Sequence, residues 1–408
     1  MILVTFHGGE PSPPNINNIF GYDETTVDST TGQPAVYPNV LSTTGTTFTL
    51  SELRGIVLEQ GILYVANGGK TVSNILGFSQ VSGGTSPSFD TPALFLGTSL
   101  TINHPFAFTF ADSATPNQWA WWVSNQDSNV VALVTAPAPT QTAPFSPANA
   151  LTSGPAGTFL QTLLANLKEQ KGTFSFLAGS FVASARVEAP LPQVTPVGKT
   201  WGGLDATVGH ATSGIADKPK EKVKVLNSVR GVLFANGILY VADEVGKLVR
   251  MYDPNTGILW GSTATSGGPV HLTVQNNTLY VSTSDGVYYG TCPSPPTEHL
   301  PTLPKPFKKH EEPVPPYPKD PPKGYNSSVT LTLTKLGLAT TNTSPSGITF
   351  DSSGNLYVAD RKGKAVYKYV PNTNGSTPPF VSPPGTTSSY ITTPDQPEFL
   401  LWYPWQSS

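Results

Sequence analysis

Charged residues are scarce in this chain of 408 residues: Asp, Glu, Lys and Arg make up 12% of it, which is about half of their share in an average soluble protein. The 23 basic and 26 acidic side chains nearly cancel, leaving a formal charge of −3. Such a chain has no general electrostatic attraction for nucleic acid or for an anionic membrane. We therefore expect neither of them among its partners.

Cysteine is almost absent as well, since the single Cys292 excludes an intramolecular disulfide framework. No apolar run approaches the roughly 18 residues that a membrane span needs, and the opening MILVTFHGG lacks the features of a signal peptide. We therefore expect no membrane insertion. The low charge and four N-x-S/T sequons favour an exported protein; the sequons start at Asn276, Asn326, Asn342 and Asn374.

What the chain has in abundance is residues that form turns. Proline occurs 41 times and glycine 38 times, while 38% of the residues are apolar. Turn formers at this density, between short apolar segments, are typical of an all-β protein with many connections.

An internal repeat runs through the sequence. A four-residue apolar-alternating element recurs as YVAN 64–67, WVSN 122–125, YVAD 240–243, YVST 280–283 and YVAD 357–360. In each copy a second alternating segment and a turn precede this element, and a third alternating segment follows it. Period-2 apolar spacing between Gly, Asn and Asp clusters is typical of short antiparallel strands. Each copy therefore predicts a small meander.

A single meander cannot bury both of its faces, so the copies must pack on one another. The shortest step between copies, from Asp243 to Thr283, has the length of one propeller blade. The two ends of the chain supply a further blade, with PEFLLWYPW at 397–405 as first strand and MILVTFHGG as second. We predict a single all-β domain, a six-bladed β-propeller closed by pairing of the N- and C-terminal strands. Trimming about ten residues from either end should unfold it.

The stretch PSGITFDSSGNLYVADRKGKAVYKY at 345–369 resembles an NHL repeat, and RGVLFANGILYVADEVGKLVRMYD at 230–253 is similar. The resemblance covers about half of the chain. NHL-like propellers include protein-binding modules, RNA-binding modules, sensor domains and enzyme relatives such as lyases and lactonases. The resemblance therefore implies the fold and leaves the activity open.

Two insertions interrupt the repeat. In residues 136–222 the spacing of Phe159, Leu160, Leu163, Leu164 and Leu167 predicts a short helix packed on the blades, or a lid over one face. This insertion is also long enough to contain a degenerate seventh blade at 172–187. Residues 292–324 are a proline-rich loop that we expect as an extended excursion between strands of the fifth blade. The alternative is a ligand for a partner domain that recognises proline.

The innermost strand of each blade lines the central channel of a propeller. The residues just before the GI or GV dipeptides then project at one mouth of the channel: Glu398, Arg54, Phe106, Arg230, Val270 and Ser346. His271 replaces the glycine of the fifth copy, and His104 precedes Phe106 by two positions. We predict a ligand-binding site that consists of Arg54, Arg230, Glu398, His271, Phe106 and His104.

Two arginines in such a mouth can bind a carboxylate, a phosphate or an acidic side chain. The main hypothesis is a recognition scaffold for a protein segment or a small anionic molecule. The competing interpretation is that these residues form an ion-pair cluster that only rigidifies the channel. An alternative is a lyase or hydrolase with His271 and Glu398 as the catalytic acid and base. A second alternative, suggested by the low charge and the Pro/Thr-rich insertions, is an extracellular structural or adhesive protein.

We expect neither a metal nor a cofactor. Lactonase relatives hold a divalent metal through Glu, Asn and Asp at the inner positions; only Glu398 matches them, and two arginines would repel a cation. A zinc site as in the amidating lyases would need His7, His104 and His271 to converge. His7 aligns with the Asp or Asn that ends the second strand, which points away from the axis. We interpret the repeated Asn67, Asn125, Asp243 and Asp360 as turn caps.

Overall fold

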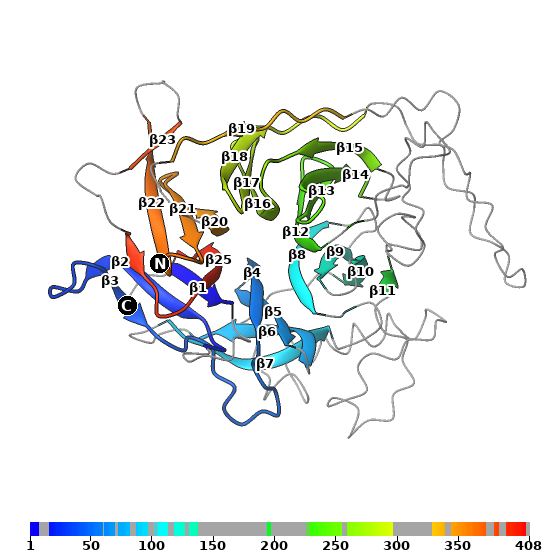
Figure 1. The fold of residues 1–408 in the computed structure, drawn as a ribbon. Helices are drawn as coiled ribbons and strands as arrows, with labels where there is room; N and C mark the ends of the chain where they lie inside the picture. Colours follow the sequence, from blue (N-terminus) through cyan, green and yellow to red (C-terminus); the bar gives the residue numbers. More distant parts are fainter. Residues whose placement is uncertain are drawn as a thin grey trace, which may run out of the picture.

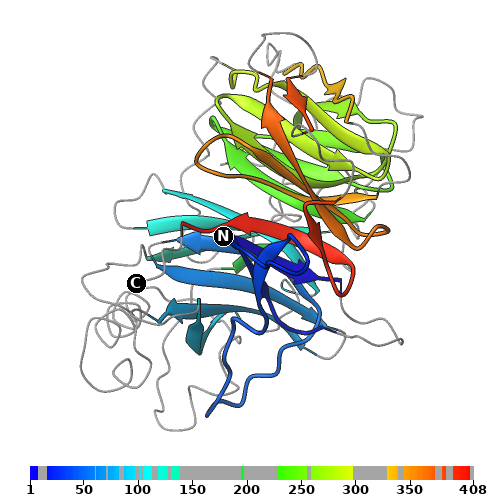
Figure 2. The same cartoon turned by 90° about the vertical axis from the view of Figure 1, so that its left-hand side faces the viewer.

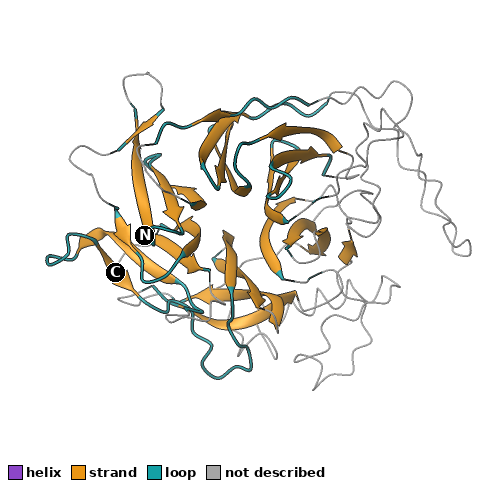
Figure 3. Ribbon diagram, in the orientation of Figure 1, coloured by secondary structure: helices purple, strands orange, loops and turns teal. Residues whose placement is uncertain are grey.

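The computed structural model describes residues 1–7, 16–59, 61–69, 72–81, 87–96, 102, 104–112, 118–126, 130–137, 194–196, 226, 228–254, 259–296, 329–338, 344–372, 379–382 and 389–404. These residues form six antiparallel sheets arranged as blades in a ring (Figure 1). Within the described ranges the chain forms strands, loops and turns but no helix (Figure 3). None of the described segments is therefore a helix that could cross a membrane.

Blades are numbered from the one that contains both chain ends, and their strands are given from the axis outward. Blade 1 consists of β25 (Pro397–Trp402), β1 (Ile2–Phe6), β2 (Phe20–Val27) and β3 (Pro34–Tyr37). Blade 2 consists of β4 (Leu53–Glu59), β5 (Ile62–Gly69), β6 (Val72–Gln80) and β7 (Phe89–Leu96). Blade 3 consists of β8 (Pro105–Asp112), β9 (Gln118–Asn125), β10 (Val130–Pro137) and β11 (Val194–Pro196).

The other three blades follow the same order. Blade 4 consists of β12 (Val229–Ala235), β13 (Ile238–Asp243), β14 (Leu248–Tyr252) and β15 (Leu259–Ala264). Blade 5 consists of β16 (Pro269–Gln275), β17 (Thr278–Thr283), β18 (Gly286–Thr291) and β19 (Thr334–Lys335). Blade 6 consists of β20 (Pro345–Phe350), β21 (Leu356–Asp360), β22 (Ala365–Pro371) and β23 (Phe380–Val381), with β24 (Ile391–Thr392) also paired to β22.

The ring is closed by strands from opposite ends of the chain, as the sequence predicts. β25 pairs antiparallel with β1, so that Leu3 lies opposite Leu401. Beyond the ladder, the Tyr403 amide donates a hydrogen bond to the Met1 carbonyl at 2.9 Å. Figure 2 shows the red C-terminal strand lying along the blue N-terminal one. Pairing the two ends removes the free inner edge that blade 1 would otherwise expose.

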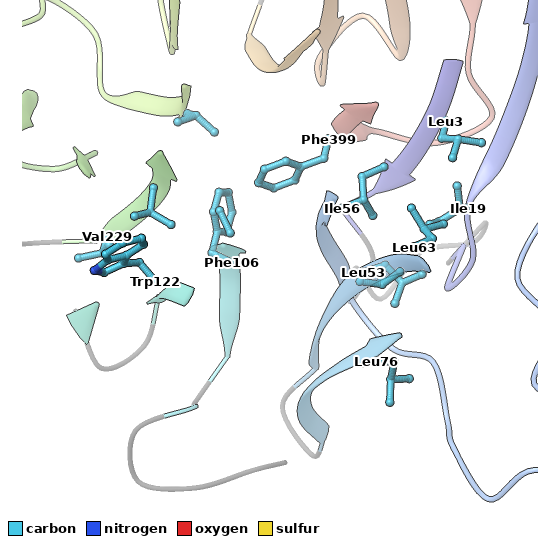
Figure 4. Packing of buried hydrophobic residues seen from close by; sticks show 14 of the residues in the cluster. Leu3, Ile19, Leu53, Ile56, Leu63, Leu76, Phe106, Trp122, Val229 and Phe399 are labelled. Atoms are coloured by element: carbon cyan, nitrogen blue, oxygen red, sulfur yellow. The ribbon is translucent and has the colours of Figure 1, made fainter. Parts of the chain in front are cut away.

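Apolar faces of neighbouring blades bury one another. Separate clusters fill the interfaces between blades 2 and 3, 4 and 5, 5 and 6, and 6 and 1. The largest cluster joins the two remaining interfaces through the axis, where Phe106 and Phe399 point toward each other (Figure 4). Because each strand alternates apolar side chains on both faces, every blade contributes to two interfaces.

The ring has six blades, so the alternative of a seventh blade in the first insertion is wrong. The inner strand β8 of blade 3 contacts β12 of blade 4 directly, and every other inner strand also contacts its neighbour around the axis. No gap is left in the ring for another inner strand. The predicted helix and the candidate strands at 172–187 lie outside the described residues.

The proline-rich insertion lies between strands of blade 5, as expected. It starts after β18, and the chain pairs again with β18 through β19. On the way back, the Val329 amide donates a hydrogen bond to the Trp260 carbonyl on the outer strand of blade 4 at 2.9 Å. Residues 329–335 therefore link the outer edges of blades 4 and 5. The rest of the insertion, from 297 to 328, lies outside the described residues.

Candidate ligand-binding site at the channel mouth

Every inner strand carries a β-bulge at the same place. The first residue of each inner strand pairs with the last residue of the second strand, or in blade 2 with Asn67, and one extra residue follows before regular pairing resumes. The residues at the bulges include Glu398, Arg54, Phe106, Arg230, Val270 and Ser346. Such bulges re-aim side chains and break the alternation of a strand. All six predicted mouth residues therefore occupy equivalent positions around the axis.

A second ring of residues surrounds the first. In each blade the residue after the one that pairs with the start of the inner strand donates its amide to the carbonyl two positions before the bulge residue, at 2.8 to 3.1 Å. This repeated bond holds His7, Gly68, Gln126, Glu244, Ser284 and Arg361 at the mouth. The prediction that His7 points away from the axis is wrong. Phe6 pairs with Pro397 as Asp243 pairs with Val229, so Phe6 and not His7 is the equivalent of Asp243.

Glu398 is fully buried and lies among three cationic or hydrogen-bonding side chains. Its Oε2 is 2.8 Å from His7 Nδ1, 3.3 Å from Arg361 Nε and 3.9 Å from Arg54 Nη1. Burial by itself would raise the pKa of Glu398, but His7, Arg361 and Arg54 outweigh it and lower the pKa to about 2. Glu398 is therefore ionised at neutral pH.

Arg54 is held by groups from its own blade and from blade 1. Its Nη2 donates to Glu52 Oε2 at 2.7 Å, and its Nη1 donates to the His7 carbonyl. Burial lowers the pKa of Arg54, whereas Glu398 and Glu52 raise it. His104 reaches the same carboxylate, with its Nε2 3.5 Å from Glu52 Oε2. The structure thus brings Arg54, Glu398 and His104 into one network, joined by Glu52 and His7.

Arg230 lies on the other side of the mouth, in blade 4, and does not share this network of contacts. Its Nε donates to Glu244 Oε2 at 2.7 Å, and the same oxygen accepts from the Ser228 hydroxyl at 2.7 Å. Its guanidinium carbon lies 4.8 Å from the centre of the Phe106 ring, which is the geometry of a cation–π contact. The Nη1 of Arg230 is buried without a hydrogen-bond partner among the described residues.

Aromatic rings fill the axis below the arginines. The centres of Phe106 and Phe399 are 5.1 Å apart, and His271 meets Phe399 edge to face at 4.9 Å. His271 Nδ1 accepts the Ile348 amide at 3.1 Å, and burial lowers the pKa of this histidine to about 4. His271 is therefore a neutral, positioned part of the channel lining at pH 7.

The remaining predicted mouth residues add no charge. Val270 is buried at the blade 5 position, and Ser346, also buried, donates its hydroxyl to the Pro397 carbonyl at 2.8 Å. Within the described part of the chain, no group of three His, Cys, Asp or Glu side chains is arranged to hold a metal ion. The histidines of the zinc alternative instead have separate partners, Glu398 for His7, Glu52 for His104 and the Ile348 amide for His271.

Three of the four repeated Asx residues, Asn67, Asp243 and Asp360, accept hydrogen bonds from loop amides, as predicted. Asn67 Oδ1 accepts the Ser51 amide at 2.8 Å, Asp243 Oδ1 accepts the Gly246 amide at 3.1 Å, and Asp360 Oδ1 accepts the Ser344 amide at 2.8 Å. All three side chains are buried. Each cap stabilises a loop that carries residues of the mouth.

Four residues of the mouth are not among those that the sequence predicts: Glu52, Glu244, Arg361 and His7, of which His7 is expected one position away. A signal for three of them exists, because each follows the four-residue repeat element or its equivalent. Reading the position after YVAD in every copy would have collected His7, Glu244 and Arg361. Glu52 precedes the inner strand at the position of His104 in the next blade.

The fold and the site define a six-bladed β-propeller with an ion-paired mouth and an aromatic-lined channel, so the architecture that the NHL resemblance implied is confirmed. Residues 334–359, the end of blade 5 and the start of blade 6, match a family model described as a beta-propeller repeat. This match covers less than one blade. No curated protein sequence matches the chain.

Several solved structures are similar to this chain. A streptogramin B lyase is 13% identical over 79% of this chain and 66% of its own, slightly under two thirds of its length, with a TM-score of 0.37. A protein from Lactobacillus plantarum is 11% identical over 92% of this chain and 79% of its own, with a TM-score of 0.42. A chain of a nidogen/laminin complex is 11% identical over 98% and 96%, with a TM-score of 0.43. At these identities and TM-scores, the similarities carry no argument about function.

Proposed function

We propose that this propeller is a recognition module that binds an anionic group, carried by a protein segment or a small molecule, at the channel mouth. The observation that supports it best is Arg230 Nη1, a buried N–H group without a hydrogen-bond partner among the described residues. Leaving such a donor unpaired in a buried place is unfavourable, and a bound carboxylate or phosphate oxygen would satisfy it. The Phe106 ring beneath the guanidinium keeps this donor in position.

The charges of the mouth limit what kind of anion site this is. Arg54, Arg230 and Arg361 are matched by Glu52, Glu244 and Glu398, and each arginine contacts at least one of these carboxylates. Net positive potential therefore contributes little. Binding rests on a defined N–H group beside an aromatic floor, which favours recognition of a particular chemical group over general attraction of anions.

The pKa values at the mouth argue against the hydrolase or lyase alternative. An efficient general acid or base has a pKa near the working pH. The pKa of Glu398 is lowered to about 2 and that of His271 to about 4, so at neutral pH neither exchanges a proton readily. Moreover, His271 Nδ1 is engaged by the Ile348 amide and its ring packs on Phe399. A recognition role fits these groups better than acid–base catalysis.

The test is binding of butanoate, a simple carboxylate with an apolar tail, followed by ligand-observed NMR. We expect Arg230→Gln to weaken binding by about tenfold or more, because a hydrogen bond to a charged group is lost. Lys362→Gln is the control: it removes the same formal charge from an exposed residue of blade 6. If both variants bind butanoate as the wild type does, Arg230 is not the anchor and the proposal is wrong.

A further inference from the structure

Several buried polar atoms of the channel mouth lack a hydrogen-bond partner among the described residues, including Arg54 Nε and Gln126 Oε1, and two of them lie on opposite sides of the mouth. One is Nη1 of Arg230 in blade 4, and the other is Oε1 of Glu398 in blade 1, both judged among the described residues. In a ring of six blades, blades 1 and 4 face each other across the axis. The mouth therefore presents a hydrogen-bond donor on one side and an acceptor on the other.

The free oxygen of Glu398 is the more unusual of the two. Every charged contact to this carboxylate goes to Oε2: His7 at 2.8 Å, Arg361 at 3.3 Å and Arg54 at 3.9 Å. The carboxylate is ionised, because these neighbours lower its pKa to about 2. Oε1 thus shares a full negative charge in a fully buried place where no described residue donates to it, and burying an ionised oxygen without a donor is costly.

The side chains between the two atoms are apolar and buried. Phe399 directly follows Glu398 at the bulge of β25, and its ring packs against Phe106 at 5.1 Å. Phe106 in turn lies under the Arg230 guanidinium, at 4.8 Å from its carbon. The two phenylalanine rings, which Figure 4 shows next to each other, therefore connect the strand of Glu398 with the guanidinium of Arg230 and offer no hydrogen bonds.

From this arrangement we infer that the ligand of the mouth is zwitterionic. It carries an anionic group that Arg230 Nη1 binds, an ammonium group that donates to Glu398 Oε1, and a short apolar stretch that joins the two. This inference rests on the proposed function and makes it more specific, since an anion alone would leave the Glu398 oxygen unsatisfied. An isolated cation would leave the Arg230 donor unsatisfied in the same way.

Three probes with one carbon frame separate these possibilities: butanoate, 4-aminobutanoate and butylamine, each titrated against the whole chain and followed by NMR. We expect 4-aminobutanoate to bind about tenfold tighter than butanoate, and butylamine to bind more weakly than either. N-acetyl-4-aminobutanoate has the same frame without the positive charge, and it should lose this advantage. These ligand-side changes do not depend on whether a variant folds.

The matching change in the protein is Glu398→Gln, which replaces the charged acceptor by a neutral amide of the same shape. In a variant that retains the far-UV circular dichroism of the wild type, the ratio of the affinity for 4-aminobutanoate to the affinity for butanoate should fall to about one. In Lys362→Gln the ratio should stay as in the wild type.

The outcomes for the zwitterion and for the anion site are distinct. Equal affinity of the wild type for butanoate, 4-aminobutanoate and the acetylated probe would overturn the inference of a zwitterionic ligand. The donor to Glu398 would then be a water molecule, and the proposed anion site would still stand. Tight binding of butylamine alone would contradict both. If none of the probes binds at millimolar concentration, the proposed function falls together with this inference.

Discussion

Single residues at the mouth act through pairs that join different blades. Glu398 of blade 1 contacts Arg54 of blade 2 and Arg361 of blade 6, so one carboxylate holds three consecutive blades together. Removing one partner of a buried ion pair leaves an uncompensated charge, which destabilises by about 3–5 kcal/mol. Glu398 is therefore a residue for stability as well as for binding.

The stability of the ring should depend on pH through Glu398. Because its folded-state pKa is about 2, below the ordinary 4.5, the ionised form stabilises the fold at neutral pH, and this contribution disappears as the pH falls from 5 toward 2. The loss amounts to roughly 3 kcal/mol, from the size of the shift. Urea unfolding at pH 7, 4 and 3 measures it. Glu398→Gln should be less stable at pH 7 and should lack this part of the pH dependence; parallel curves for both proteins would contradict the assignment.

At the scale of strands, the bulge brings the inner strands close together. Gly347 of β20 faces the bulge of β25 so closely that a Cβ would lie 2.6 Å from the Leu400 amide nitrogen and 2.7 Å from Phe399 Cα. Gly55 and Gly231 meet the backbone of the next blade in the same way. At these three positions the glycine of the GI or GV dipeptide allows the backbones of neighbouring blades to come close, since a Cβ would meet the next blade.

A methyl group at this position should therefore weaken the ring. We expect Gly347→Ala to destabilise the protein by about 1–3 kcal/mol, since the atoms that it meets are backbone atoms that cannot move alone. Gly337→Ala is the matched control, because Gly337 is exposed with no atom within 4 Å of an added Cβ. The measurement is the melting temperature of each variant, which should be lower for Gly347→Ala than for Gly337→Ala. A Gly347→Ala protein as stable as the Gly337→Ala protein would show that the blades can separate slightly at no cost.

The outermost strands are the elements that the sequence did not predict. β19 has two residues and β23 has two, too few for an alternating pattern to be recognised. β11 has three and lies inside the first insertion, far from the rest of blade 3 in sequence. These strands form because the third strand of each blade offers free backbone hydrogen-bonding groups, which any nearby extended segment can pair with.

At the scale of the whole molecule, the two chain ends belong to one sheet. Since the ladder between β25 and β1 depends on pairing and not on which end carries which strand, a covalent link between the ends should preserve it. We expect a circular permutant that joins Ser408 to Met1, with new ends within 297–328, to melt within a few degrees of the wild type. The paired experiment deletes 397–408, which removes the inner strand of blade 1.

This deletion should abolish the cooperative thermal transition, because blade 1 loses the contacts that its inner strand makes with blades 2 and 6. Both proteins are compared with the wild type by circular dichroism and size-exclusion chromatography. A permutant that aggregates would contradict the closure described here. A truncated chain that melts like the wild type would do so as well.

The sequence by itself determined the strands of five repeats, the closure by the chain ends and the six positions at the bulges. It could do so because alternating apolar residues and turn residues act locally, and because a repeat places equivalent residues at equivalent points of a ring. The sequence predicted six blades and left seven open, and the tertiary structure decided between them; it alone decided the partners of Arg54, Arg230 and Glu398. An ion pair between blades depends on which side chains the ring brings within a few ångströms, and residues 7, 54, 361 and 398 acquire that proximity only when the circle is closed.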